Sequence, residues 1–296
     1  MSKWLVFLKE RFNPLQYIPT IAVFLAANAL YISRSENLEI TTLSVFLTFL
    51  MLTSFFLRMR LFDEIKDYEV DLKINPTRPL ARGLITINEV KKAIVILLAA
   101  EALIAMALSP GTLVIWLVAA LYSLLMYKEF FIGRWLRPHL TTYAITHTFV
   151  VNLLALLIMA GAAGFQWQDL HAYHEAFIAM NWCYFNLFEF ARKTFAATEE
   201  RSGVDTYSSL FKPLGAWFLS IKEVLLGVIL INASTINPLF FIGDRVRTKV
   251  AILAMIYFVL SLSYLFTPSL KTAKFFRTIS GIYLLTHFLI LAWTLY

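Results

Sequence analysis

The sequence predicts an all-α, multi-pass integral membrane protein with nine transmembrane helices in a single domain over residues 1–296. Three observations predict this class. Hydrophobic residues make up 59% of the chain and charged residues only 15%, whereas soluble domains hold about 25% charged residues. Apolar runs near 20 residues, the length that a helix needs to cross a bilayer, recur along the chain. None of them alternates like a barrel strand, so the spans are expected to be helices.

Nine apolar runs are long enough to cross a membrane. Their approximate limits are 15–33, 39–62, 89–109, 112–130, 141–162, 171–191, 213–232, 247–266 and 277–296. The first run continues past Tyr31 and contains Asn28. It is therefore longer than the apolar region of a signal peptide, and we expect a retained helix. The second run is the longest, and its last turn is polar.

Basic residues are distributed unevenly between the two sides of the predicted membrane. Of the 26 Lys and Arg residues, 21 fall on the side of the N-terminus and 4 on the other, while Lys222 lies within a span. This bias predicts that the N-terminus and the polar connections 63–88 and 192–212 are cytoplasmic. On a membrane protein the excess of basic residues indicates topology and contact with membrane lipid, and no nucleic acid is expected as a partner. The single cysteine, Cys183, excludes a disulfide framework and a Cys-rich zinc site.

Acidic residues gather at the end of the second run, where five of the 19 lie within residues 63–71. Asp63, Asp67 and Asp71 are spaced by four and so share a helix face, which Glu64 borders. Like charges at this spacing repel by roughly 0.7 kcal/mol per pair in water. A divalent metal is the simplest compensation, and Mg²⁺ bound by carboxylates commonly bridges to substrate phosphates. The alternative is a solvated helix end whose acids pair with their basic neighbours, which are Arg58, Arg60, Lys66 and Lys73.

The residues after this acidic segment add groups that bind phosphate. Pro76 and Pro79 end the helix and stiffen a loop. They hold Arg78 and Arg82 close to the acids, and arginine is suited to bidentate binding of phosphate. Acids that hold a metal beside arginine donors predict a site for a metal–diphosphate.

This segment resembles the first signature of the UbiA superfamily of intramembrane prenyltransferases. The matching residues are Asp63-Glu64-x-x-Asp67-x-x-x-Asp71 and then Asn75-Pro76-x-Arg78-Pro79-Leu80-x-x-Gly83. Nine helices with signatures after the second and sixth also match the family. Asp63 stands where the family normally has Asn, and Glu64 stands where it normally has Asp.

A second family signature is expected after the sixth span, and the chain departs from it there. Gly203 and Thr206 fit the ending of that signature, and Glu199 falls near one of its acidic positions. The usual Asp-x-x-x-Asp is absent. Helical spacing would place the charged residues of this stretch around a shared wide face, and a helix end with internal ion pairs is the alternative. These residues are Glu189, Arg192, Lys193, Glu199 and Glu200.

The resemblance implies a Mg²⁺-dependent enzyme of isoprenoid biosynthesis whose helices surround a lipophilic cavity. The first Mg²⁺ would be held by Asp63, Glu64, Asp67 and Asp71. A second would be held by Glu199 and Glu200 with Glu189. Asp63, Asp67, Asp71 and Glu199 would thus act in catalysis. The basic residues implied in diphosphate binding are Arg78, Arg82, Lys128, Arg192 and Lys193, with Arg11 within reach before the first span. Lys128 follows Tyr127 as in the family's Tyr-Lys pair, although a boundary lysine that extends to the interface is the alternative.

Three functions follow, in descending order of preference. A prenyltransferase would join an isoprenyl diphosphate to a lipophilic acceptor such as an aromatic ring. A membrane-bound terpene cyclase of the same superfamily would let an internal double bond attack instead. A cation or lipid transporter is least favoured, because transporters bind near the midplane and the acids here lie at one face.

Several polar side chains fall inside the predicted spans, where an ionisable group is a candidate functional residue. They are Glu101, His147, Asn152, Asn181, Asn186, Lys222 and Glu223. We leave them outside the predicted catalytic set. His171 and His174, on the opposite side, are expected to be structural or exposed.

Overall fold

The computed structural model describes residues 2–201, 203–235 and 243–296, and the regular secondary structure in these ranges is helical. Seven segments are long and apolar enough to cross a membrane, so the protein is a polytopic all-α membrane protein. They are α2 (Pro14–Glu36), α3 (Thr42–Lys66), α6 (Pro110–Tyr127), α8 with α9 (Leu140–Thr148 and Val150–Ala163), α11 (Tyr207–Ser234), α12 (Gly243–Phe266) and α13 (Leu270–Leu295).

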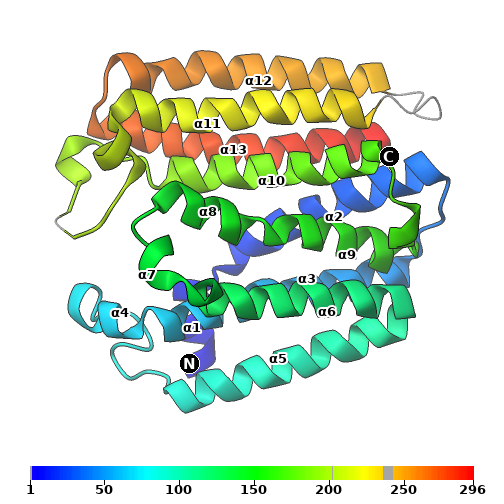
Figure 1. Cartoon of the computed structure of the whole chain (residues 1–296), viewed down its shortest axis with the longest axis horizontal. Helices are drawn as coiled ribbons and strands as arrows, with labels where there is room; N and C mark the ends of the chain where they lie inside the picture. Colours follow the sequence, from blue (N-terminus) through cyan, green and yellow to red (C-terminus); the bar gives the residue numbers. More distant parts are fainter. Residues whose placement is uncertain (1, 202, 236–242) are drawn as a thin grey trace.

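Two further helices coincide with predicted spans but do not meet the criteria that the seven segments meet. α5 (Ile87–Leu108) and α10 (Ala172–Arg192) hold 22 and 21 residues and run alongside the others (Figure 1). The described residues thus contain a helical segment at each of the nine predicted positions. Seven of the nine meet the length and apolarity of a span, and a count of nine is not established by these criteria.

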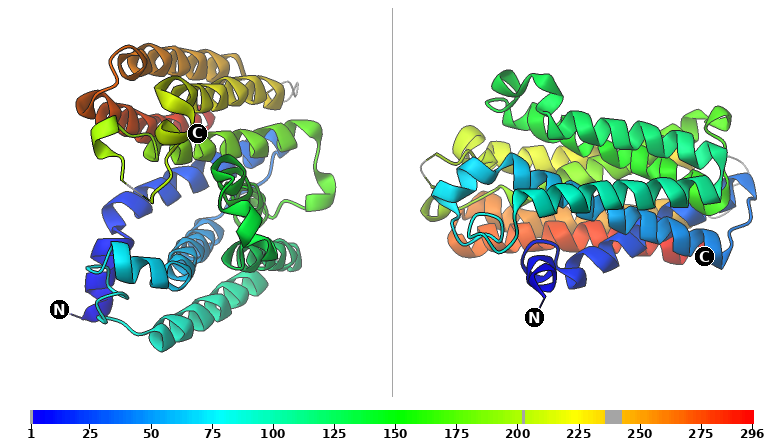
Figure 2. Two further views of the ribbon diagram at one scale, coloured as in Figure 1. Left: turned by 60° about the vertical axis from the view of Figure 1, so that its left-hand side comes forward. Right: turned by 90° about the horizontal axis from the view of Figure 1, so that it is seen from below.

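The long helices form a closed ring. Neighbours in chain order pack against each other, and α13 returns to pack against α2. Besides its neighbours α6 and α10, α9 also contacts α2 and α3. Figure 2 shows the same bundle from two further sides. The largest cluster of buried residues joins these helices and includes Phe24, Phe55, Leu154, Tyr184 and Phe288.

Polar residues begin and end the helices where the apolar runs stop. Thr41 and Thr86 form capping boxes with the third residue of α3 and α5. Gly164 ends α9 in a left-handed conformation. Short helices occupy the connections, and they are α1 (Lys3–Arg11), α4 (Tyr68–Ile74), α7 (Gly133–Leu136), η1 (Glu129–Phe131), η2 (Trp167–Asp169) and η3 (Ala197–Glu199). α1, α4 and α7 lie at one end of the bundle, with the connection from α10 to α11 (Figure 1).

A buried ion pair joins α3 to α5 within the bundle. Arg58 and Glu101 are both fully buried, and Arg58 Nη2 lies 2.9 Å from Glu101 Oε2. Ser123 accepts a hydrogen bond from Arg58, and Trp116 donates one to Glu101, so α6 is tied to the same pair. The alternative interpretation, in which Arg58 pairs with the acidic segment, is therefore wrong for this residue. An arginine inside a span is retained only with such a partner, because an unpaired buried charge is costly.

Three other polar residues inside the spans, Asn181, Lys222 and Glu223, also find partners within the bundle. The amide groups of Asn28 and Asn181 bond to each other and join α2 to α10, with an N–O distance of 3.0 Å for the Asn181 donor. Lys222 Nζ donates to Glu223 Oε1 at 2.6 Å on α11. These contacts explain why three of the polar residues noted in the predicted spans, Asn181, Lys222 and Glu223, are retained there.

Candidate active site

A cavity of about 610 Å³ lies at the end of the bundle that carries the short helices. This volume falls in the range of small-molecule sites. One part of the lining is charged and comes from the ends of α1, α3 and α10, from the residues that flank α4 and from the connection between α6 and α8. The other part is apolar and comes from residues nearer the middle of the helices. The apolar and aromatic lining includes Phe56, Met59, Phe62, Met126, Val150, Val151 and Phe185.

The three aspartates predicted to share a helix face keep that register across a helix junction. α3 ends at Lys66 and α4 begins at Tyr68, with Asp67 between them at φ −90° and ψ 0°. The backbone N–H of Asp67 nevertheless donates to the carbonyl of Asp63 at 2.9 Å, and that of Asp71 donates to the carbonyl of Asp67 at 2.8 Å. Asp63 and Asp67 line the cavity, whereas Asp71 does not.

These aspartates differ in their partners. Asp63 accepts from Lys66 Nζ at 3.2 Å. Asp71 is buried and accepts from Arg78 Nη1 at 2.5 and 2.6 Å. The Asp67 carboxylate makes no hydrogen bond or ion pair with any side chain that the structure describes.

Burial raises the pKa of the Asp67 carboxyl above its ordinary value. Lys66 and Arg78 lower this pKa, while the neighbouring Asp63 and Asp71 raise it further. A half-buried carboxylate beside like charges and without a side-chain partner is a group that a cation would stabilise.

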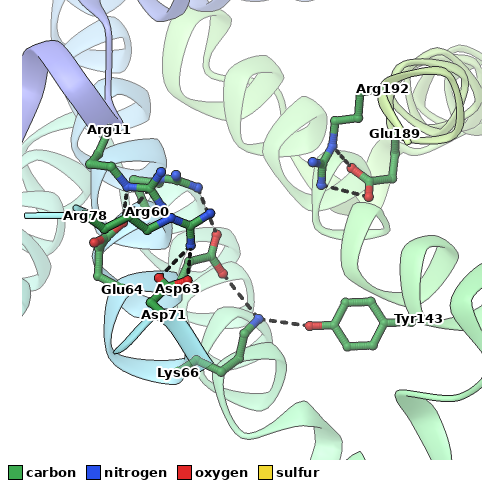
Figure 3. A network of polar contacts seen from close by, with 10 residues as sticks. All are labelled: Arg11, Arg60, Asp63, Glu64, Lys66, Asp71, Arg78, Tyr143, Glu189 and Arg192. Atoms are coloured by element: carbon green, nitrogen blue, oxygen red, sulfur yellow. Dashed lines mark hydrogen bonds and ion pairs between the residues drawn. The ribbon is translucent and has the colours of Figure 1, made fainter. Parts of the chain in front are cut away.

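Glu64 is turned away from the cavity lining. It is buried, and its Oε1 accepts a hydrogen bond from Arg11 and lies 3.8 Å from Arg60 Nε. Arg11, Arg60 and Arg78 all line the cavity and form one group at the end of α3 (Figure 3). Glu64 thus holds two arginines at the rim. Arg60 was missed as a site residue, although its position three residues before Asp63 places it on the same helix face.

The donor set at this rim fits a metal that is shared with a ligand. Among the described residues no three His, Cys, Asp or Glu side chains converge as a metal site. Mg²⁺, however, commonly takes one or two carboxylates and completes its shell with water and substrate phosphates. Asp63 and Asp67 supply two such carboxylates, so the site fits Mg²⁺ together with a diphosphate.

The second predicted group lies at the end of α10, and cations dominate it. Glu189, Arg192 and Lys193 line the cavity. Both Glu189 oxygens accept from Arg192, which donates from Nη2 at 2.8 Å and also from Nε (Figure 3). Lys193 Nζ lies 3.4 Å from Glu189. Burial lowers the pKa of Lys193. The carboxylate is therefore engaged, and the cations beside it face the cavity.

Glu199 and Glu200 lie outside the cavity lining. Arg277 of α13 donates to Glu199 at 2.7 and 3.0 Å, and this contact lowers the pKa of the Glu199 carboxyl. Glu200 accepts from the hydroxyl groups of Thr206 and Ser208 at 2.8 Å. The expected shared face does not form, because α10 ends at Arg192 and helical spacing does not continue to residues 199 and 200.

Lys128 and Arg82 also lie away from the cavity lining. Arg82 pairs with Glu10 at 2.8 Å, and this bond holds the pKa of Glu10 below its ordinary value. Lys128 is exposed, with its Nζ 5.0 Å from the centre of the Tyr127 ring.

The turn that follows Lys128 brings Glu129 into the cavity lining instead. Three successive residues that are not glycine, Glu129, Phe130 and Phe131, have φ of 49°, 54° and 59°. Arg137 holds Glu129 at 2.8 Å and also lines the cavity. Runs of residues other than glycine with positive φ are rare and costly in energy, and no sequence pattern predicts them. The sequence therefore did not identify Glu129 and Arg137 as residues of the site.

Tyr143 of α8 completes the rim. Lys66 Nζ donates to the Tyr143 hydroxyl at 2.9 Å, so one lysine connects Asp63 of α3 to α8 (Figure 3). The Tyr143 ring in turn stacks on the His147 ring, with 3.9 Å between their centres. Both rings line the cavity.

Comparison with known proteins identifies solved structures with a similar fold. The sequence significantly matches no protein-family model and no curated protein. The structure is similar to one described for digeranylgeranylglyceryl phosphate synthase in membranes, with a TM-score of 0.68 at 18% identity over 100% of this chain and 99% of the other.

Two archaeal structures are also similar. A UbiA homologue from Aeropyrum pernix K1 has a TM-score of 0.64 at 18% identity, over 92% of this chain and 96% of its own. A UbiA homologue from Archaeoglobus fulgidus, bound to DMAPP and Mg²⁺, has a TM-score of 0.65 at 14% identity, over 98% and 99%. The resemblance to the UbiA superfamily is thus confirmed for the fold across the whole chain.

Proposed function

We propose that the protein is an intramembrane, Mg²⁺-dependent prenyltransferase that ionises an isoprenyl diphosphate and transfers the prenyl group to a lipophilic acceptor. One observation carries this proposal: a single cavity joins a charged rim at the end of α3 and α10 to an apolar and aromatic wall. An isoprenyl diphosphate has the same two parts. The similar structure that holds DMAPP and Mg²⁺ supports this choice of ligand.

The charge of the cavity favours a polyanion. Seven basic and four acidic side chains line it, so its formal charge is positive. The basic residues are Arg11, Arg60, Lys66, Arg78, Arg137, Arg192 and Lys193, and the acidic residues are Asp63, Asp67, Glu129 and Glu189. Fixed cations around a dry cavity stabilise negative charge that develops on a leaving group.

We assign the bound Mg²⁺ to Asp63 and Asp67, and as a Lewis acid it would stabilise the departing diphosphate. Arg192 and Lys193 supply positive charge where the family's second acidic motif would hold a metal. When the bond between C1 and the diphosphate oxygen breaks, its electron pair leaves with the diphosphate. Phe56, Phe185 and the other aromatic residues in the lining would exclude water and stabilise the carbocation.

The membrane arrangement is part of the proposal. We infer that α5 and α10 cross the bilayer with the seven apolar segments, giving nine spans, a single domain over 1–296 and a cytoplasmic N-terminus. A polar side chain near the middle of each helix faces inward: Glu101 of α5 and Asn181 of α10 are fully buried. Polar groups inside the bundle lower the mean apolarity of a helix without exposing charge to lipid.

Product analysis tests the function. The protein in nanodiscs would receive Mg²⁺ and farnesyl or geranylgeranyl diphosphate, with and without a lipophilic acceptor. We expect diphosphate release that a chelator abolishes and a prenylated product when the acceptor is present. The matched control is Asp244→Asn, which changes an exposed carboxylate of α12 outside the cavity lining.

Two other results would contradict the transferase. A cyclic hydrocarbon or alcohol formed without acceptor would identify a terpene cyclase. Failure to consume either diphosphate, with or without metal, would reject both enzymes.

A further inference from the structure

The connection between α6 and α8, residues 128–139, lies where two apolar segments leave the bilayer. α6 ends at Tyr127 and α8 begins at Leu140, and both helices belong to segments that are long and apolar enough to cross a membrane. The connection contains η1 and α7 and lies at the same end of the bundle as α1 and α4 (Figure 1). Because a span ends where the hydrocarbon core ends, these residues lie at the level of the lipid headgroups.

This connection has an inner and an outer side. Glu129 and Leu136 are buried, and Glu129 lines the cavity. Three large apolar side chains are exposed instead: Phe131 by 78%, Ile132 by 49% and Trp135 by 54%. Exposed apolar groups gathered in this way mark a surface that binds a partner or a membrane.

The outer side is also basic. Lys128 and Arg134 are exposed, and neither forms an ion pair with any residue that the structure describes. The nearby Arg137, in contrast, is engaged by the Glu129 carboxylate at 2.8 Å. Aromatic rings sit at the headgroup level of a membrane, and Lys and Arg near its surface attract anionic lipids. Charge and position therefore both favour an anionic lipid headgroup as the partner.

The backbone links this outer side to the cavity. Glu129, Phe130 and Phe131 have positive φ, and a Cβ atom at Gly133 would collide with the Glu129 carboxylate. Phe130 packs on the inner side, where its ring meets the His147 ring at 89° with 5.7 Å between centres. One strained turn thus places Glu129 in the cavity lining and exposes Phe131. Such strain persists only where the surroundings hold it, and on the outer side those surroundings are the membrane surface.

We propose that the outer side of residues 128–139 binds the anionic phospholipid headgroups of the bilayer in which the protein sits. The three exposed apolar side chains enter the headgroup region, and Lys128 and Arg134 pair with phosphate oxygens. This binding supports the turn that places Glu129 at the cavity rim. The lipid-binding side chains themselves lie outside the cavity lining, so the lipid binding does not depend on the reaction proposed above.

Quenching of tryptophan fluorescence tests this surface without any substrate. The protein is placed in phosphatidylcholine nanodiscs with a small fraction of brominated phosphatidylglycerol or, at the same fraction, brominated phosphatidylcholine. We expect the anionic lipid to quench more strongly. Trp135→Phe should remove most of this excess, which assigns it among the seven tryptophans. Lys128→Gln with Arg134→Gln should weaken the preference for the anionic lipid by about fivefold per charge removed.

The matched control is Lys91→Gln with Lys92→Gln. It removes the same charge from exposed residues of α5 outside the cavity lining, and the excess quenching should stay near the wild-type value. Tryptic cleavage after Lys128 and Arg134, followed by mass spectrometry, gives a second measurement on the unmodified chain. Cleavage there should be slower in nanodiscs that contain phosphatidylglycerol than in phosphatidylcholine alone. Phe131→Ser with Trp135→Ser should be cut faster than the wild type in both.

Three outcomes would overturn this proposal. The two brominated lipids could quench the wild type equally. The Lys91 and Lys92 variant could lose as much of the preference as the Lys128 and Arg134 variant, which would show a general effect of net charge. A dimer in detergent that Phe131→Ser with Trp135→Ser dissociates would assign the surface to a second copy of the chain. Diphosphate release is not measured in these experiments, so the proposed function stands or fails separately.

Discussion

The two acidic segments at the cavity end of the bundle differ in what their carboxylates face. At the end of α3, Asp63 and Asp67 line the cavity, and Asp67 has no partner among the described side chains. After α10, Glu199 is bound by Arg277, and Glu200 accepts from two hydroxyl groups, both away from the lining. Of the glutamates Glu189, Glu199 and Glu200, only Glu189 lines the cavity, and Arg192 engages both of its oxygens.

This difference shows that an acidic residue at or near an acidic position of a family signature is not for that reason alone a metal ligand. In the first segment the backbone continues its spacing of four across the junction at Asp67, so the carboxylates stay on one face. In the second the helix stops at Arg192, and the glutamates that follow bind other elements of the fold. We infer that the first segment provides the metal site and that the second contributes mainly cations to the rim.

The largest contrast is expected from neutralising one carboxylate in each segment. Asp67→Asn should lower diphosphate release by about 100- to 1,000-fold, because metal-assisted stabilisation of the leaving group is lost. Glu200→Gln should change it by less than about threefold, since Glu200 lies outside the lining. Both rates are measured on protein that elutes as a single species. Equal losses in the two variants would remove the distinction between the segments.

An intermediate effect is expected from the cations of the second segment. Arg192→Gln should raise KM for the prenyl diphosphate by about 10-fold or more, because a hydrogen bond to a charged group is lost. The dependence of the rate on Mg²⁺ should stay unchanged in this variant. Glu189→Gln is the paired test: an unchanged Mg²⁺ requirement supports a rim of cations, whereas a raised requirement would show that Glu189 binds metal, as the family resemblance implied.

The smallest effect concerns stability. Arg277 holds the pKa of Glu199 below its ordinary 4.5, so this contact stabilises the fold at neutral pH and is lost as the pH falls below that value. Glu199→Gln should lower the free energy of unfolding by roughly 1–2 kcal/mol at pH 7. Thermal unfolding in detergent should show no difference from the wild type under acidic conditions. The exposed Glu175→Gln serves as the control, and a difference that persists in acid would contradict the assignment.

Much of the fold could be predicted because the signals are local. Apolar runs placed every long helix, and the spacing of Asp63, Asp67 and Asp71 anticipated a register that the backbone preserves. Two of the predicted diphosphate-binding residues, Lys128 and Arg82, do not line the cavity, because the tertiary structure places their side chains elsewhere. Lys128 is exposed beyond the end of α6, and Arg82 pairs with Glu10, so neither side chain lines the cavity.

The sequence by itself determined that the chain is a helical membrane protein with a cluster of carboxylates and arginines at one face. Composition, run length and helical spacing are properties of neighbouring residues, and the bilayer enforces them. Only the tertiary structure decided which of those charges face the cavity and which are paired elsewhere. It also placed Tyr143 and His147 beside the end of α3. Such choices depend on contacts between segments far apart in the chain, where the cost of leaving a buried charge or acceptor alone selects the partner.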